Sequence, residues 1–160
     1  MTNHKTHSVL FVGLGGQGVL LASGVTAMVA FRAGMDVKQS EVHGMAQRGG
    51  SVTSQVRFGK KVYSALIPQG TADILVAFHN RESVRCRPQL KPDGIVIDPT
   101  VNGAENELRN KWGNVYVLGL LSKHLPFDAN IWEEVIQTVV PERFLEVNLA
   151  AFQRGASSGL

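Results

Sequence analysis

The sequence predicts an α/β fold in which helices cover both faces of a doubly wound, mostly parallel β-sheet. Short apolar, β-branched runs alternate along the chain with longer helical patterns, which is the order that strand–helix–strand units produce. The run Ser8–Gly13 passes through a glycine turn into a long apolar helical segment. The continuous apolar run Ala72–Phe78 is typical of a strand buried on both faces. Because no linker or repeat interrupts these patterns, we expect residues 1–160 to form a single α/β domain.

The first half of the chain supplies one helix and the predicted antiparallel insert. The helix after the glycine turn is apolar nearly all round, which predicts deep burial, and Gly34 is placed to end it. A second strand follows at 35–42. The segments Ser51–Gly59 and Lys60–Pro68 both alternate by side-chain face, and we expect them to form a β-hairpin inserted into the sheet.

The second half is richer in helices. Asn80 is placed to cap a helix that runs to about Leu90, and a buried strand follows at 94–100. The pattern is weak at 101–114, and the apolar run 115–125 is compatible with a strand or a helix. Asp128 or Asn130 opens the next helix, and the last one is expected to start at Pro141 and to end at Gly155.

Composition limits the possible functions. The net charge of +3 and scattered cations make nucleic acid a weak partner hypothesis and fit an anionic small molecule or an acidic protein equally well. One cysteine, Cys86, cannot form a disulfide, a zinc site or an iron–sulfur cluster within the chain, and we expect a helix residue rather than a reactive thiol. We expect surface or capping roles for the following histidines: His4, His7, His79 and His124. No signal peptide, membrane span or metal constellation is evident, which predicts a cytoplasmic protein.

The glycine turn "GLGGQG" matches the pattern G-x-G-x-x-G through Gly13, Gly15 and Gly18, and it lies between a predicted strand and helix in the Rossmann-like manner. A helix amino terminus offers free N–H groups to a phosphate. Three interpretations stay open: an NAD or FAD site in which Glu41 binds the ribose, a site for another anion, and a tight turn that serves packing alone.

A second glycine-bearing segment, "SEVHGMAQRGGSV" at 40–52, follows the second strand and is therefore predicted at the same edge of the sheet. Arg48 can bind phosphate or carboxylate, His43 can carry a proton, and Gly49, Gly50 and Ser51 can donate hydrogen bonds. The alternative is an irregular loop that binds its own carbonyls. The chain shows no paired carboxylates, no nucleophile beside a base and no metal site. We therefore predict no complete catalytic set and a site finished by another subunit.

These motifs carry a family resemblance. The stretches "GLGGQGVLLAS", "SEVHGMAQRGGSVTSQVRFG" and "VYSALIPQGTADILVAF", with the end of the chain, closely resemble the small subunit of 2-oxoacid:ferredoxin oxidoreductases. The beta subunit of indolepyruvate oxidoreductase is the nearest form, and the gamma subunit or domain of the pyruvate and ketoisovalerate enzymes is a more distant one.

The resemblance implies a fold, a reaction and a set of partners. These complexes oxidatively decarboxylate a 2-oxoacid to an acyl-CoA and pass electrons to ferredoxin or a similar acceptor. Thiamine diphosphate, Mg²⁺ and iron–sulfur clusters belong to the other subunits, so the isolated chain is expected to be inactive and to bind none of these cofactors alone. The small subunit is expected to help shape the coenzyme A region.

By the same resemblance, two loops carry the site. The glycine loop comprises Gly13, Gly15, Gly16, Gln17 and Gly18. The loop near the partner's active site comprises His43, Gln47, Arg48, Gly49, Gly50 and Ser51.

One departure concerns residues 101–114, where the family has a longer segment with a further strand and helix. The resemblance implies an aromatic substrate such as indolepyruvate, and the short segment suggests an aryl-oxoacid enzyme with a different subunit plan, such as one acting on phenylglyoxylate. The alternatives are a stand-alone Rossmann-type nucleotide-binding reductase and a purely structural interaction module.

Overall fold

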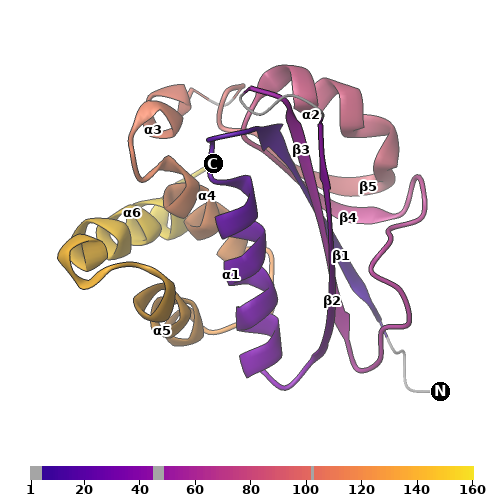
Figure 1. Cartoon of the computed structure of the whole chain (residues 1–160), viewed down its shortest axis with the longest axis horizontal. Coiled ribbons are helices and arrows are strands. Elements are labelled where there is room, and N and C mark those ends of the chain that lie inside the picture. Colours follow the sequence, from indigo (N-terminus) through magenta and orange to yellow (C-terminus); the bar gives the residue numbers. More distant parts are fainter. Residues whose placement is uncertain (1–4, 45–48, 102) are drawn as a thin grey trace.

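A five-stranded sheet with helices on both faces forms the core of the computed structural model, which describes residues 5–44, 49–101 and 103–160 (Figure 1). The strands lie in the order β2-β3-β1-β4-β5. The elements, in chain order, are β1 His7–Leu14, α1 Val19–Arg32, β2 Asp36–His43, β3 Ser51–Gly59, β4 Ala72–Ala77, α2 Asn80–Cys86, the 3₁₀ turn η1 Arg87–Gln89, β5 Leu90–Ile97, α3 Glu105–Arg109, α4 Gly113–Ser122, α5 Ala129–Val139, the 3₁₀ turn η2 Glu142–Phe144 and α6 Leu145–Ser157.

The predicted α/β class is confirmed, and the sheet is mixed in its pairing. β1 pairs parallel with β4, and β4 pairs parallel with β5. β3 runs antiparallel to both of its neighbours, β1 and β2. Four strands therefore point in one direction and β3 alone points in the other, so the antiparallel insert is a single strand.

The predicted hairpin partner of β3 is wrong. Residues 60–68 form no strand, and β3 forms its hairpin with β2 through the connection 44–50. A strand has two hydrogen-bonding edges, and β2 and β1 occupy both edges of β3. Residues 60–71 instead form a loop over the face of the sheet, where Arg57 Nη1 donates to the carbonyl oxygens of Ser64 and Leu66, and Ile67 N donates to Gln55 Oε1.

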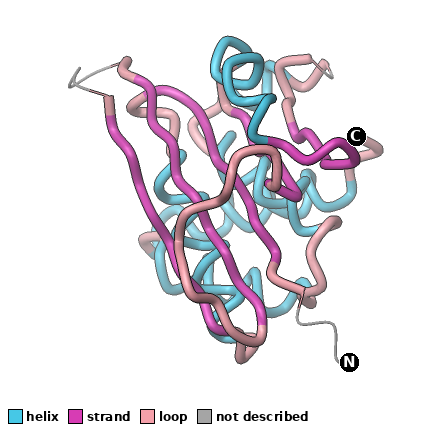
Figure 2. The backbone as a smooth tube through the Cα atoms, turned by 90° about the vertical axis from the view of Figure 1, so that its right-hand side faces the viewer, coloured by secondary structure: helices cyan, strands magenta, loops and turns pink. Residues whose placement is uncertain are grey.

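The central strand β1 is buried on both faces because its side chains alternate between two apolar clusters. Val9 and Phe11 join the larger cluster, which includes residues of α1 and α4–α6. Leu10 and Val12 face the opposite side, where they pack in a second cluster with Ile67 of the 60–71 loop. Figure 1 shows the helical layer on one side of the sheet, and Figure 2 shows the 60–71 loop crossing the other side, which α2 also covers.

Helix α1 is less buried than its composition predicts. It ends as expected near Gly34, whose φ of 84° is the left-handed conformation of a residue that follows a helix. Its outward side chains, Leu21, Met28 and Phe31, are 38, 38 and 73% exposed.

The helices at the carboxyl end differ from the prediction in their boundaries. Residues 115–125, for which strand and helix were both open, fall largely in α4. Pro141 precedes a 3₁₀ turn rather than α6 itself, and α6 continues through Gly155 to Ser157. Gly155 does not end the helix because it faces Gly119 of α4, and a Cβ on either glycine would overlap the backbone of the other helix. The two glycines thus let α4 and α6 pack backbone to backbone. Within the described ranges, no helix combines the length and apolar character needed to cross a bilayer.

Two further sequence predictions concern single side chains. His79, rather than Asn80, caps α2: its Nδ1 accepts a hydrogen bond from the backbone N–H of Arg81. Cys86 is fully buried against the second apolar cluster, and this burial raises the pKa of its thiol despite the neighbouring Arg85. A raised thiol pKa disfavours the thiolate, as expected of a packing residue.

Candidate functional site

The two glycine-bearing segments meet at one edge of the sheet. The register of β1 and β3 places Leu14 opposite Ser51, and Gly15 N donates to the carbonyl oxygen of Gly50 over 2.9 Å. Gly44 N donates in turn to the carbonyl oxygen of Ser51 over 2.8 Å, which closes the base of the second segment. This edge holds the carboxyl ends of β1, β4 and β5, as the doubly wound interpretation predicts. Gln47 and Arg48 lie outside the described residues.

Packing explains part of the G-x-G-x-x-G pattern. A Cβ on Gly13 would approach within 2.7 Å of Val19 Cγ2, and one on Gly18 would approach within 2.5 Å of Asn114 Nδ2. Gly18 also has a φ of 79°. By contrast, Gly16 has a φ of 92° and its added Cβ would meet no atom within 4 Å, so its backbone faces open space. The turn therefore combines two glycines required for packing with one that leaves the backbone open to a ligand.

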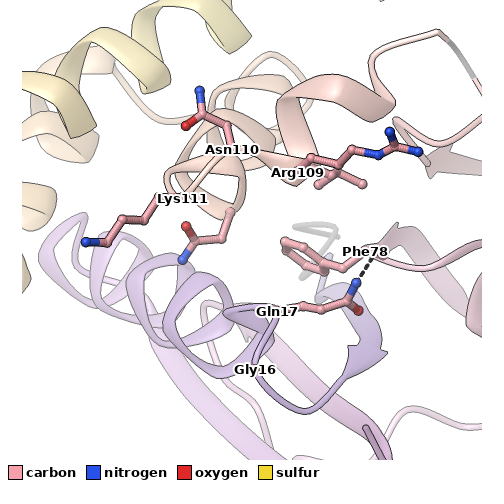
Figure 3. Close-up of a pocket in the computed structure, with 8 residues that line it drawn as sticks. Gly16, Gln17, Phe78, Arg109, Asn110 and Lys111 are labelled. Carbon is pink, nitrogen blue, oxygen red and sulfur yellow. Dashed lines mark hydrogen bonds between the residues drawn. The ribbon is translucent and has the colours of Figure 1, made fainter.

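Gln17 holds the glycine loop to the sheet. Its Oε1 accepts from the backbone N–H of Leu14 at 2.7 Å, and its Nε2 donates to the carbonyl oxygen of Phe78 at 3.0 Å (Figure 3). These bonds join the end of β1 to the residue that follows β4. Helix α1 then begins with Gly18 at its N-cap and without a side-chain cap, so its first N–H groups remain available to an anion.

A polar cleft of about 320 Å³ opens beside this loop. Its lining residues are Gly16, Gln17, Phe78, Leu108, Arg109, Asn110, Lys111 and Asn114. In Figure 3, Gln17 and Phe78 lie below the 109–111 segment, from which Arg109 and Lys111 extend in opposite directions. Arg109 Nη2 lies 3.0 Å from Glu105 Oε1, whereas Lys111 Nζ lies 4.9 Å from the ring centre of Phe144. Two basic residues therefore line the cleft, Arg109 paired with Glu105 and Lys111 beside an aromatic ring. Sequence reasoning missed both, because the run 101–114 shows no periodicity.

A second, more apolar cleft of about 310 Å³ lies on the α1 side of the same edge. It is lined by Leu14, Gly15, Gly16, Gly18, Val19, Leu20, Leu21, His43 and Val52. His43 lies at the end of β2, and its Nε2 is 3.6 Å from Glu41 Oε2. Neither side chain is buried, so the pair is solvent-exposed. The structure thus brings His43 to the glycine loop, and it places Glu41, the ribose candidate, beside His43 on the edge strand.

A third cleft of about 290 Å³ lies on the α2 side and contains a buried carboxylate. It is lined by Leu14, Gly49, Ser51, His79, Arg81 and Glu82. Ser51 Oγ donates to Glu82 Oε1 over 3.0 Å, and Arg85 donates to Glu82 Oε2 over 2.6 and 3.0 Å. Burial raises the pKa of Glu82, but the hydrogen bonds from Arg85 and Ser51 outweigh burial and hold the pKa below its usual value.

Glu82 therefore fixes the predicted Ser51 from the other face of the sheet. Sequence reasoning placed Glu82 only in a helix, because the contact joins residues that are 31 positions apart. Across the described ranges, no three histidine, cysteine, aspartate or glutamate side chains gather as a group that could hold a metal ion.

Comparison with known proteins assigns the family. Residues 8–110 match the model of the pyruvate ferredoxin/flavodoxin oxidoreductase family. The chain belongs to this family. It is 31% identical over 194 positions to the indolepyruvate oxidoreductase subunit IorB of Thermococcus kodakarensis, and the match covers 96% of each chain. The resemblance noted from the motifs is therefore confirmed, and the chain is a member of an oxidoreductase family.

Solved structures of two 2-oxoacid ferredoxin oxidoreductases share the fold. The gamma subunit of a keto/oxoacid ferredoxin oxidoreductase from Geobacter sulfurreducens superposes with a TM-score of 0.76 at 24% identity, over 94% of both chains. A 2-oxoglutarate:ferredoxin oxidoreductase from Magnetococcus marinus, solved with 2-oxoglutarate, coenzyme A and succinyl-CoA bound, gives a TM-score of 0.77 at 24% identity. That match covers 96% of this chain and 31% of the other.

This chain is shorter than its relative, and the sequence predicted a shortened segment at 101–114. The 194 aligned positions exceed the 160 residues of this chain, so the T. kodakarensis relative has residues without a counterpart here. Between β5 and α4, the described residues form only the short helix α3. This short connection brings Arg109 and Lys111 to the glycine loop.

Proposed function

We propose that this chain is the small subunit of a thiamine-diphosphate- and iron–sulfur-dependent 2-oxoacid:acceptor oxidoreductase complex. The substrate would be an aromatic 2-oxoacid such as indolepyruvate or phenylglyoxylate, and the product an acyl-CoA. Membership of the family and the match to an indolepyruvate oxidoreductase subunit over nearly the whole chain support this proposal. Ferredoxin or a similar acceptor would receive the electrons through the complex.

The chain's own part would be to shape the coenzyme A region at the subunit interface. The observation that carries this role is the hydrogen bond between Gly15 and Gly50, which joins the two glycine-bearing segments beside an open polar cleft. The residues present fit a phosphorylated ligand: Gly16 leaves its backbone accessible, the start of α1 offers N–H groups, and the cleft is lined by Lys111 and by Arg109, which is paired with Glu105.

The roles of the subunits would differ because the cofactors are carried by the partner subunits. Thiamine diphosphate, Mg²⁺ and the clusters, carried by partner subunits, would supply the decarboxylation and the electron transfer. This chain would bind the anionic end of coenzyme A and orient it. Its contribution is then positional, which improves the effective concentration of the reacting thiol at the neighbouring centre.

Reconstitution tests the assignment. The purified chain alone is expected to turn over no 2-oxoacid, and mixing it with the larger subunit from the same organism is expected to restore acyl-CoA formation. Competence of the lone chain, or micromolar binding of NAD(P)H or FAD to it, would support the stand-alone reductase instead. If the chain is instead an interaction module that binds no ligand, coenzyme A should leave the rates of amide hydrogen exchange at 13–18 and 49–51 unchanged in the complex.

The polar cleft can be tested separately. Replacing both Arg109 and Lys111 by alanine should raise the KM for coenzyme A about tenfold and leave the KM for the 2-oxoacid unchanged, because each phosphate contact contributes on the order of 1 kcal/mol or more. Arg32→Ala is the matched control, since Arg32 ends α1 far from the glycine loop and makes only a surface ion pair with Glu134. Equal effects in the two variants would remove the cleft from the proposal.

A further inference from the structure

A surface on the opposite side of the sheet from the helical layer combines positive charge with exposed apolar side chains. It consists of the loop 60–71 and the outer side of residues 80–89, and we call it the α2-side surface. It carries five cations and one carboxylate. The cations are Lys60, Lys61, Arg81, Arg85 and Arg87. Helices α3–α6, residues 105–157, have the opposite balance, with five cations and seven carboxylates, and α1 on the same side of the sheet adds one cation, Arg32.

Three large apolar side chains project from the α2-side surface into solvent. Tyr63 is 88% exposed, Leu66 is 61% exposed and Val84 is 64% exposed. Val84 lies between Arg81 and Arg85 in a shallow groove of about 350 Å³ along α2, which Asn80 also lines. Tyrosine and arginine are among the residue types most enriched at the energetic centres of protein interfaces, so this composition is typical of a docking surface.

The irregular loop in this surface is held in place by the sheet beneath it. Arg57 donates to the carbonyl oxygens of Ser64 and Leu66, Gln55 accepts from Ile67 N, and Asp36 accepts from Val62 N. Tyr63 and Leu66 are thus exposed on a fixed backbone, and a fixed backbone loses little conformational entropy when a partner binds.

The α2-side surface is continuous with the candidate site. Arg81 lines both the groove along α2 and the cleft that contains Ser51 and Gly49. A protein seated on α2 would therefore reach the edge of the sheet where the two glycine-bearing segments meet. Among the described residues, no ion pair joins Arg81 or Arg87 to a carboxylate. Acidic groups on the bound protein would therefore complement the charge of this surface.

We propose that the α2-side surface docks an acidic, apolar-centred patch of the larger subunit of the oxidoreductase complex. This proposal rests on the proposed function, because it takes the larger subunit as the partner. Docking here places the partner's reaction centre next to the 49–51 segment, because Arg81 lines both the groove along α2 and the cleft that contains Gly49 and Ser51.

The test measures the affinity of the full chain for the larger subunit from the same organism by biolayer interferometry at two salt concentrations. Tyr63→Ser is expected to weaken binding about tenfold or more, as hot-spot tyrosines do. Arg87→Glu is expected to weaken binding by a similar factor at low salt and less at high salt, because salt screens exposed charges. Both residues are exposed, so circular dichroism should show unchanged folding.

Matched controls on other faces make the result specific. Phe31→Ser removes the exposed aromatic ring of α1, and Arg143→Glu reverses an exposed charge beside α6; both should bind within about threefold of wild type. If Phe31→Ser weakens binding while Tyr63→Ser does not, the docking surface is wrong and the proposed function survives. If the wild-type chain neither binds the larger subunit nor restores its activity, the proposed function itself fails.

Two other occupants are outcomes of the same experiment. Concentration-dependent dimerisation of the isolated chain that Arg87→Glu abolishes would assign the surface to the acidic helices α3–α6 of a second copy. Binding of a 20-base-pair DNA duplex that Arg87→Glu abolishes would assign it to nucleic acid. Either result, with unchanged affinity of both variants for the larger subunit, would overturn the proposal.

Discussion

Removing the carboxylate of Glu82 should destabilise the fold and loosen the second glycine-bearing segment. The side chain is 8% exposed and accepts hydrogen bonds from Ser51 Oγ at 3.0 Å and from Arg85 at 2.6 and 3.0 Å. A hydrogen bond to a charged group contributes about 1.5–3 kcal/mol. Because the Arg85 side chain is 53% exposed and regains water when its partner is lost, its share is discounted. We expect Glu82→Ala to lower the free energy of unfolding by about 2 kcal/mol, or Tm by about 4–8 °C.

Urea denaturation followed by tryptophan fluorescence measures this change, since Trp132 is fully buried in the core. Glu134→Ala is the control, because Glu134 makes only an exposed ion pair with Arg32 and should change stability by less than about 0.5 kcal/mol. Equal losses in Glu82→Ala and Glu134→Ala would refute the reasoning.

The pH dependence gives a second, independent test with Glu82→Gln, which cannot ionise. The pKa of Glu82 is lowered in the folded state, so its contribution is present above the unfolded value and is lost as the pH falls through the folded pKa. The stability gap between wild type and Glu82→Gln should therefore narrow as the pH falls from 7 to 4 and below. A gap of constant size across that range would show that the carboxylate charge has no role.

Three further predictions concern single residues. Gly18→Ala should lower the free energy of unfolding by about 1–2 kcal/mol, because its φ is 79° and Asn114 occupies the space of a Cβ. Gly24→Ala, inside α1 with open space at the Cβ, should instead raise the free energy of unfolding by about 0.5–1 kcal/mol. Thermal unfolding of the two variants and of the wild type measures both changes. His7 stacks on Phe58, and burial, followed by the charge of Lys5, lowers its pKa, so protonation is disfavoured in the fold and stability falls as the pH drops below 6.5; an NMR titration should give a value below 6.5. Burial raises the pKa of Cys86, so iodoacetamide should modify the native chain far more slowly than the urea-unfolded chain at pH 8, and equal rates would contradict its burial.

Local patterns were sufficient for most of the fold. The run at 8–13, the glycine turn and the apolar helix gave β1 and α1 nearly to the residue, because strand and helix periodicities differ clearly there. The predicted hairpin partner was wrong for a reason that local patterns cannot show. Residues 60–68 alternate like a strand, but β2 and β1 already occupy both hydrogen-bonding edges of β3. Gly155 was placed at a helix end for the same reason, since only the crossing with Gly119 shows why a glycine lies inside α6.

The sequence likewise predicted one part of the candidate site and missed another. The meeting of Gly15 with Gly50 could be predicted, because both segments follow strands that end at one edge. The contributions of Glu82 and Lys111 could not, because each reaches the site through a long-range contact from a segment whose sequence shows only helix or irregular structure.

The return of β3 beside β2 has a consequence for variation in this family. The connection 44–50 leaves and re-enters the sheet at adjacent strands, so residues can be gained or lost within it while every rung of the ladder between 36–43 and 51–59 keeps its partner. A change of length in this connection therefore leaves the pairing of β2 with β3 unaltered. Exchanging this connection between relatives should therefore leave the strand pairing of the sheet intact, because connecting segments tolerate insertions and deletions better than the strands they join.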